Sequence, residues 1–310
     1  MLGIFKHNSI DFMSKRKYAM IFSAVLLLIS IGSLAVNQLN FGIDFTGGTL
    51  VEVGYPNSVE LAGVQAKLAS KGFDNAVVQH FGNSKDVLIR VAPRDDVTQN
   101  DISKKVLDAL KEGEPEVQLR RSEYVGPQIG EELTEQGGLA MLYALIGILV
   151  YVTLRFEYRF SIGSVAALVH DVLITLGFFS LFKINFDLTV LAALLAVIGY
   201  SLNDTIVVYD RIRENFRRMR KGTAVEIMNT SINQTLSRTI VTSLTTLLVL
   251  LALFFLGGEV IHAFSMALLV GVIIGTYSSI YVASSVALNL GVSKADLMPV
   301  QKEGEELDQP

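Results

Sequence analysis

The sequence predicts a polytopic α-helical membrane protein with six transmembrane helices and an α+β domain inserted between the first helix and the second. Three observations predict this fold class. Of the 310 residues, 51% are hydrophobic and only 18% are charged, whereas about a quarter of the residues of soluble domains are charged. Six apolar runs have lengths typical of membrane spans. A polar segment, residues 37–136, separates the first run from the second.

The first apolar run covers residues 18–36 and follows a polar start, residues 1–17, with four basic side chains. This run is long enough to cross a bilayer. A basic start, an apolar core and the small residues from Ser33 to Ala35 also resemble a cleaved signal peptide. We favour a retained first helix, because further spans follow and their orientation fits a chain that keeps it.

The segment 37–136 alternates between two kinds of pattern. Strand-like patterns cover 48–54, 75–81, 86–92 and 116–125, and helix-like patterns cover 58–71, with Ser58 as N-cap, and 98–111. The order β-α-β-β-α-β matches the ferredoxin-like motif. A domain of this size can bury a modest core.

The remaining spans and connections follow from hydropathy and charge. Spans are predicted at 137–154, 160–182, 188–209, 238–257 and 263–290, with a basic loop at 210–237 and an acidic, disordered tail at 291–310. Lys and Arg concentrate in the N-terminal segment, after the second span and in the loop 210–237. Because basic residues favour cytoplasmic flanks, we expect both termini in the cytoplasm and the α+β domain on the outer, periplasmic side.

Composition excludes several functions. The chain has no Cys and four scattered His, so we expect no disulfide and no metal site. A net charge of −4 gives no indication of a nucleic-acid partner. Gly47 and Gly48 lack the Lys and Ser that would complete a phosphate-binding loop, and no pairing of a nucleophile with a base is visible. We therefore expect neither an enzyme nor a bound cofactor.

Asp204 is the first candidate functional residue, because it lies within the apolar run 188–209. An ionisable group in a membrane span is costly and is functional by default. Tyr200 and Ser201 lie at i−4 and i−3, on the same helical face, and Asn203 adjoins. This pattern favours a protonatable group on a polar path. The alternative is an aspartate that reaches the interface and is solvated there or pairs with Arg211.

Arg238 is the second candidate and stands at the edge of the fifth span. Thr242, Thr245 and Thr246 continue one hydroxylated face from it, which favours contact with protein or water over lipid. Arg238 would then be the partner of Asp204 across two spans. A basic flank whose side chain snorkels to the interface explains Arg238 about as well.

Two further groups stand out within the spans. His170 and Asp171 lie near the centre of the third span, either as a satisfied structural pair or as a secondary proton path. Gly271, Gly275 and Ser279 belong to a ridge of small residues at every fourth position of the last span, which is typical of close helix packing.

Several longer motifs, in order along nearly the whole chain, resemble the SecD/SecF family of the bacterial Sec export machinery. The motifs are Gly42-Ile-Asp-Phe-Thr-Gly-Gly-Thr-Leu50, Val125-Gly-Pro-Gln-Ile-Gly-Glu-Glu-Leu133, His170-Asp-Val, the stretch from Tyr200 to Glu214, and Gln234-Thr-Leu-Ser-Arg-Thr239. The length and the six spans resemble the smaller, SecF branch, whose inserted domain is smaller than that of SecD.

The resemblance implies one six-helix half of a transporter of the resistance-nodulation-division (RND) type in the bacterial cytoplasmic membrane. It implies pairing with SecD, association with YajC, the SecYEG channel and the SecA ATPase, and the use of the proton motive force to complete export of an unfolded polypeptide. In that family, proton coupling rests on positions that fall here on Asp204 and Arg238, and an aspartate of SecD completes the site. Protons are then the coupling ion.

Three other functions remain open at this stage. A proton-driven RND-type small-molecule exporter would need a drug-sized pocket, for which the segment 37–136 leaves little room. A structural membrane scaffold would tolerate the loss of the Asp204 carboxylate. An intramembrane enzyme has the least support: Tyr209-Asp210 resembles one element of an intramembrane aspartyl protease, but the Gly-x-Gly-Asp element that would accompany it is missing.

Overall fold

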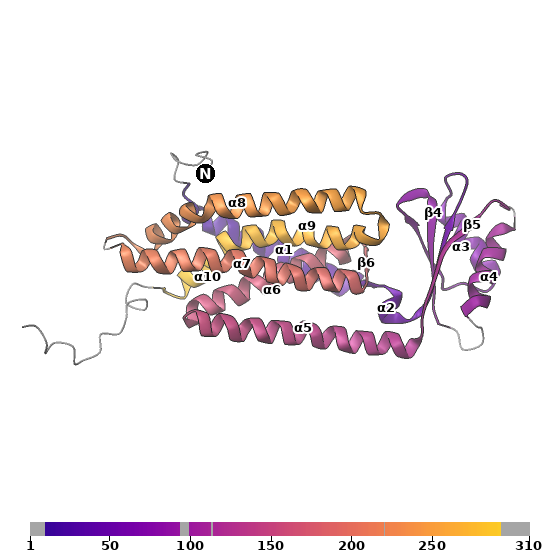
Figure 1. Cartoon of the computed structure of the whole chain (residues 1–310), viewed down its shortest axis with the longest axis horizontal. Helices are drawn as coiled ribbons and strands as arrows, with labels where there is room; N and C mark the ends of the chain where they lie inside the picture. Colours follow the sequence, from indigo (N-terminus) through magenta and orange to yellow (C-terminus); the bar gives the residue numbers. More distant parts are fainter. Residues whose placement is uncertain (1–9, 94–98, 113, 220, 293–310) are drawn as a thin grey trace, which may run out of the picture.

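The computed structural model describes residues 10–93, 99–112, 114–219 and 221–292. It consists of a long helical bundle with an α+β domain at one end (Figure 1). The expectations for residues 1–9, for the tail 293–310 and for Arg220 of the basic loop lie outside these ranges.

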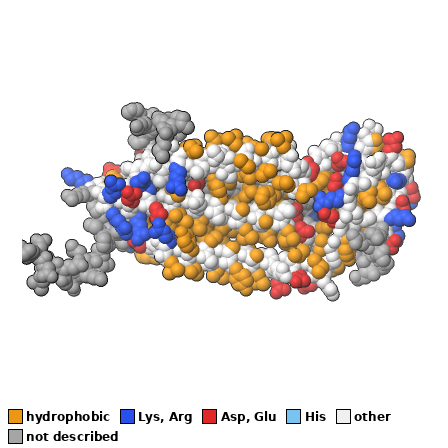
Figure 2. Space-filling model, in the orientation of Figure 1, with side chains coloured by type: hydrophobic (Ala, Val, Ile, Leu, Met, Phe, Trp, Pro, Cys, Tyr) orange, Lys and Arg blue, Asp and Glu red, His pale blue; other side chains and the backbone are white. Residues whose placement is uncertain are grey.

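Six helices in the described residues are long and apolar enough to cross a membrane. They are α1 (Arg16–Asn37, after the turn η2, Met13–Lys15), α5 (Pro127–Arg155), α6 (Tyr158–Leu181), α7 (Leu188–Arg218), α8 (Ala224–Leu256) and α9 (Glu259–Ser278), which continues through the π-helical turn η3 (Ser279–Ala283) into α10 (Ser284–Asn289). On the face shown in Figure 2, exposed hydrophobic side chains cover the middle of the bundle, and Lys and Arg gather at the end opposite the α+β domain. Six spanning helices and an inserted domain are therefore what the fold shows.

The helices α7 and α8 extend well beyond their apolar runs. The segment 210–237, expected as a loop, is helical except for a short connection between Arg218 and Ala224. Buried apolar residues recur along these extensions, among them Ile212 and Phe216 of α7. A capping box then starts α8: the Thr223 hydroxyl accepts from the Glu226 N–H, and the Glu226 carboxylate accepts from the Thr223 N–H. Packing and capping, rather than lipid, set these helix ends.

The α+β domain runs β2 (Gly48–Gly54), α3 (Leu61–Ser70), β3 (Val77–Phe81), β4 (Asn83–Val91), α4 (Gln99–Lys111) and β5 (Gln118–Val125). The sheet order is β3-β4-β2-β5, and every neighbouring pair is antiparallel. This is the β-α-β-β-α-β arrangement that the sequence predicts. The expected cap at Ser58 is wrong, because α3 begins after Glu60, with no side-chain cap.

One face of this sheet carries the helices and the other faces the bundle. Apolar residues of β2 and β4 pack with residues of α3 and α4, for example Val51 and Ile89 with Leu68 and Val106. Side chains of the opposite face, such as Leu88 and Arg90, line a cavity shared with the domain-side ends of α7 and α9. The sheet therefore sits with its open face toward the helix that contains Asp204.

Candidate functional site

Asp204 lies in the interior of the bundle on α7. Asp204 is 3% exposed, and its Oδ2 atom is buried without a hydrogen-bond partner among the described residues. Arg211, the alternative interfacial partner, instead pairs with Glu214 at 2.8 Å. A buried carboxylate with an unpaired oxygen is costly in the charged form. Its position therefore suits a group that alternates between the charged and the neutral form.

Arg238 lies on the neighbouring helix α8, and its side chain is exposed on the surface of the bundle. It is close enough to Asp204 to act on it electrostatically, yet the described residues contain no ion pair between them. Thr242 donates its hydroxyl to the carbonyl oxygen of Arg238 at 3.0 Å, and Thr245, further along this face, is exposed as well. The guanidinium and the threonine face are therefore available to a surface outside this chain.

The polar residues around Asp204 diverge. Tyr200 is half-buried and donates to Ser243 of α8 at 3.3 Å, and Ser243 shares a hydrogen bond of 2.7 Å with Thr276 of α9. Ser201 is buried and donates to Asp171 of α6. Asn203 is exposed and points out of the bundle. Two separate hydroxyl paths thus start one turn before Asp204.

His170 and Asp171 form the centre of a buried network that joins four helices. The His170 Nδ1 atom lies 2.8 Å from Asp171 Oδ1, and its Nε2 atom lies 3.1 Å from the hydroxyl of Ser23 on α1. Asp171 Oδ2 accepts from Ser201 of α7 and, at 2.7 Å, from Ser278 of α9. Both carboxylate oxygens of Asp171 are therefore bonded, whereas the Oδ2 atom of Asp204 has no partner among the described residues. This arrangement favours the structural interpretation of the pair over the proton path.

Gly271 and Gly275 lie on the side of α9 that meets α7. A Cβ atom on Gly271 would lie 2.2 Å from Val197 Cγ2, and one on Gly275 would lie 3.0 Å from the Cβ atom of Ser201. Ser279 is fully buried in the π-helical turn η3 that follows. The small residues thus permit close approach of α9 to the helix of Asp204.

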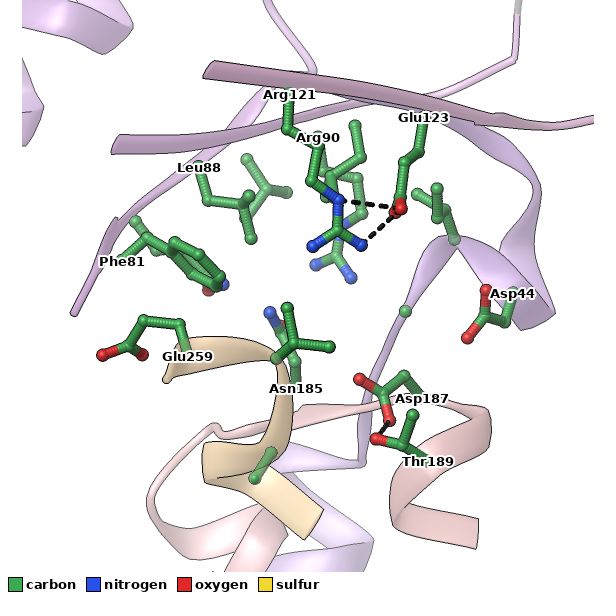
Figure 3. Close-up of a pocket in the computed structure, with 17 residues that line it drawn as sticks. Asp44, Phe81, Leu88, Arg90, Arg121, Glu123, Asn185, Asp187, Thr189 and Glu259 are labelled. Carbon is green, nitrogen blue, oxygen red and sulfur yellow. Dashed lines mark hydrogen bonds and ion pairs between the residues drawn. The ribbon is translucent and has the colours of Figure 1, made fainter. Parts of the chain in front are cut away.

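A second polar region lies at the domain-side end of α7 and was not singled out as a site by the sequence analysis. Asp44, Arg90, Asp187 and Glu259 line a cavity of about 270 Å³ between the sheet and the ends of α7 and α9 (Figure 3). Burial lowers the pKa of the Arg90 guanidinium below its ordinary value. The sequence signal for this region is Asp44, which lies in the family motif Gly42–Leu50.

Comparison with known proteins agrees with this architecture. Residues 105–293 match the family described as protein export membrane protein SecD/SecF, C-terminal, and residues 32–55 match the SecD/SecF GG motif. The chain is 55% identical to the protein translocase subunit SecF of Vibrio alginolyticus, over 97% of each chain. It is 50% identical to SecF of Pseudomonas aeruginosa, over 98% of this chain and 99% of that one.

Solved structures give the same relationship. The crystal structure of SecDF from Thermus thermophilus, described as a translocon-associated membrane protein, superposes with a TM-score of 0.85 at 39% identity. The match covers 94% of this chain and 40% of that one, so this chain spans about two-fifths of the SecDF polypeptide. The super-membrane-facing form of SecDF matches with a TM-score of 0.68 at 40% identity, over 91% of this chain and 39% of that one. The chain therefore belongs to the SecD/SecF family of protein export membrane proteins.

Proposed function

We propose that this chain works with a SecD-type subunit in the bacterial cytoplasmic membrane and uses the proton motive force to promote late steps of protein export. The supporting observation is the division of polar groups between the inside and the outside of the chain. Asp204 is buried with an unpaired oxygen, whereas the neighbouring Arg238 is exposed on the bundle surface. An arginine facing lipid is expensive, so a partner surface is needed beside it.

The proton switch has three members. Asp204 takes up and releases the proton, and Arg238 stabilises the carboxylate when it approaches. A carboxylate of the SecD-type partner neutralises Arg238 when Asp204 is protonated. Each proton that crosses supplies about 2.3 kcal/mol per 100 mV of membrane potential. A few kcal/mol change the populations of a two-state helix bundle by orders of magnitude.

The proposal extends to the assembly that the family resemblance implies. YajC joins the two subunits, and the SecYEG channel with SecA supplies the unfolded polypeptide. Both termini of the chain are cytoplasmic, and the α+β domain faces outward. The chain acts as a transport subunit rather than as an enzyme, with protons as its coupling ion and no bound cofactor. The names of its relatives do not favour the small-molecule exporter.

The test is proton-driven export into inverted vesicles that contain the complete translocase. We expect Asp204→Asn and Arg238→Met each to abolish the stimulation by the proton gradient while export driven by ATP continues. Asp210→Asn is the matched control, since Asp210 lies on the same helix in a half-exposed ion pair with Arg155 at 2.7 Å, and such pairs contribute little. Full stimulation in the Asp204 variant would remove the proposed role of this residue.

A further inference from the structure

The domain-side end of α7 is held by a carboxylate from another part of the chain. Leu188, the first residue of α7, donates its backbone N–H to Asp44 Oδ2 at 3.1 Å. The helix also has its own cap, because Asp187 Oδ1 accepts from the Val190 N–H at 2.9 Å. Carboxylates stabilise the unpaired N–H groups and the positive end of a helix dipole at this position. Asp44 is therefore bound to the helix that contains Asp204.

Asp44 belongs to residues 40–47, here called the joint segment. The backbone of the joint segment is hydrogen-bonded to the residues directly before α7. Strand β1 (Asn40–Phe41) pairs in parallel with β6 (Asn185–Phe186), directly before α7. Gly42 then donates its N–H to the Phe186 carbonyl at 2.8 Å. A Cβ atom on Gly42 would lie 3.2 Å from the Cβ atom of Asp187, so the contact is close. The joint segment and the start of α7 thus form one packed unit.

The sheet of the α+β domain is fastened to this unit by Arg90 of β4. The guanidinium donates to the Phe41 carbonyl and, at 2.6 Å, to Asn40 Oδ1. Strand β2 also begins at Gly48, directly after the joint segment. The sheet is therefore linked to the joint segment both covalently and through a charged hydrogen-bond donor, and the joint segment in turn contacts the start of α7.

Between these attachments the sheet does not fill the space above the helices. The cavity of about 270 Å³ lies between Leu88 and Phe81 of the sheet and Asp187 and Glu259 of the helices (Figure 3). The tip of the β3–β4 hairpin closes it on one side, since a Cβ atom on Gly82 would lie 2.5 Å from Glu259 Oε1. Apolar and charged side chains share its walls, and a cavity of this size has room for several waters.

We propose that Asp44 and Arg90 are positioning residues that transmit movements of α7 to the sheet of the α+β domain. This inference rests on the proposed proton switch at Asp204. The contact of Asp44 with Leu188 and the proton switch at Asp204 lie on one continuous helix, α7. At about 1.5 Å per residue, this helix spans about 24 Å between Leu188 and Asp204. A tilt or shift of α7 that accompanies proton exchange therefore reaches the joint segment and, through Arg90, the sheet. The outer domain moves because α7 moves.

The test separates coupling from proton exchange in the complete translocase in vesicles. Asp44→Ala is expected to lower proton-stimulated export about fivefold or more, while the pH profile of carbodiimide labelling at Asp204 stays as in the parent. Because the chain has no Cys, spin labels on Ser84→Cys and Leu181→Cys report the distance between sheet and bundle. We expect this distance to change between pH 5 and pH 8 in the parent and to stay constant in Asp44→Ala and Arg90→Ala.

Matched variants guard the interpretation. Asp44→Asn keeps an oxygen that can accept from Leu188 and should retain most of the proton-stimulated export. This variant keeps the inference testable if Asp44→Ala folds poorly. Thr134→Val removes a hydrogen bond of 3.2 Å from α5 to Phe45 of the same joint segment and should behave as the parent. Parental export and a parental distance change in Asp44→Ala and Arg90→Ala would overturn the inference, as would an altered Asp204 labelling profile. If Asp204→Asn loses the stimulation and the Asp44 and Arg90 variants do not, the proton switch is supported and the coupling through Asp44 and Arg90 is refuted.

Discussion

At the scale of the residue, Gly271 shows how a single missing side chain positions the helix of Asp204. The close approach of α9 to α7 leaves a distance of 2.2 Å from a Cβ atom on Gly271 to Val197 Cγ2, which is too short for any real contact. Val197 is itself buried, so it cannot move aside freely. Overpacking of this kind costs about 1–3 kcal/mol.

Gly271→Ala is therefore expected to lower the thermal unfolding midpoint of the purified chain, whereas Gly147→Ala should leave it unchanged or raise it. Both glycines lie within helices, but a Cβ atom on Gly147 would meet nothing within 4 Å. The control therefore reports the gain in helix propensity without the clash. Equal midpoints for the two variants would contradict the close packing of α9 on α7.

The sequence predicts which residues belong to the site better than it predicts the direction in which their side chains point. Hydropathy singles out Asp204, because charged groups in long apolar runs are rare, whereas Arg238, at the edge of its span, is indicated only by the threonine face that continues from it and by the family resemblance. It could not predict that Asp204 is buried while Arg238 and Asn203 are exposed. Neighbouring residues on a helix point about 100° apart, and packing against other helices sets the rotation. The sequence pattern contains that packing only indirectly.

At the scale of the element, Asp171 holds helices α6, α7 and α9 together. Its two oxygens bond His170, Ser201 and Ser278, and all four residues are buried. Removing the acceptor would leave several buried polar groups unpaired, at a cost of about 1–3 kcal/mol each. The network therefore fixes the rotation of α7 one turn before Asp204.

A substitution that keeps the hydrogen bonds distinguishes this structural role from a proton path. Asp171→Asn can still accept from the two serines and can donate an amide hydrogen to His170, so we expect folding and proton-stimulated export to be largely retained. Asp171→Leu should lower the thermal unfolding midpoint strongly. If Asp171→Asn folds normally but loses the stimulation as completely as Asp204→Asn, Asp171 itself relays protons.

The elements themselves were predicted unequally well. The inserted domain followed from period-two and helical patterns, because its core requires alternating faces. The ends of α7 and α8 did not follow, because they extend past the apolar runs on buried residues such as Phe216 and Met228. The short segments β1 and β6 were also missed. Two residues in each strand are too few for a periodic signal, and their pairing joins distant parts of the chain.

At the scale of the whole molecule, the charge distribution predicts how the chain lies in the membrane. Basic side chains gather at the end of the bundle opposite the α+β domain (Figure 2). The described parts of both ends of the chain, η2 and α10, lie at that basic end too (Figure 1). Because basic flanks favour the cytoplasmic side, we predict that the open face of the sheet and the cavity beside Asp44 lie on the outer side.

The absence of Cys from the sequence allows a direct test of this orientation. Ser84 and Lys221 are both exposed, the first in the β3–β4 hairpin and the second in the connection between α7 and α8. We expect a membrane-impermeant maleimide to label Ser84→Cys in spheroplasts and to label Lys221→Cys only in inverted vesicles. Detergent-solubilised samples, in which both positions should react, control for accessibility. The reverse pattern would place the α+β domain in the cytoplasm, where it could not act on a polypeptide that has already crossed, and the proposed late role in export would fail with it.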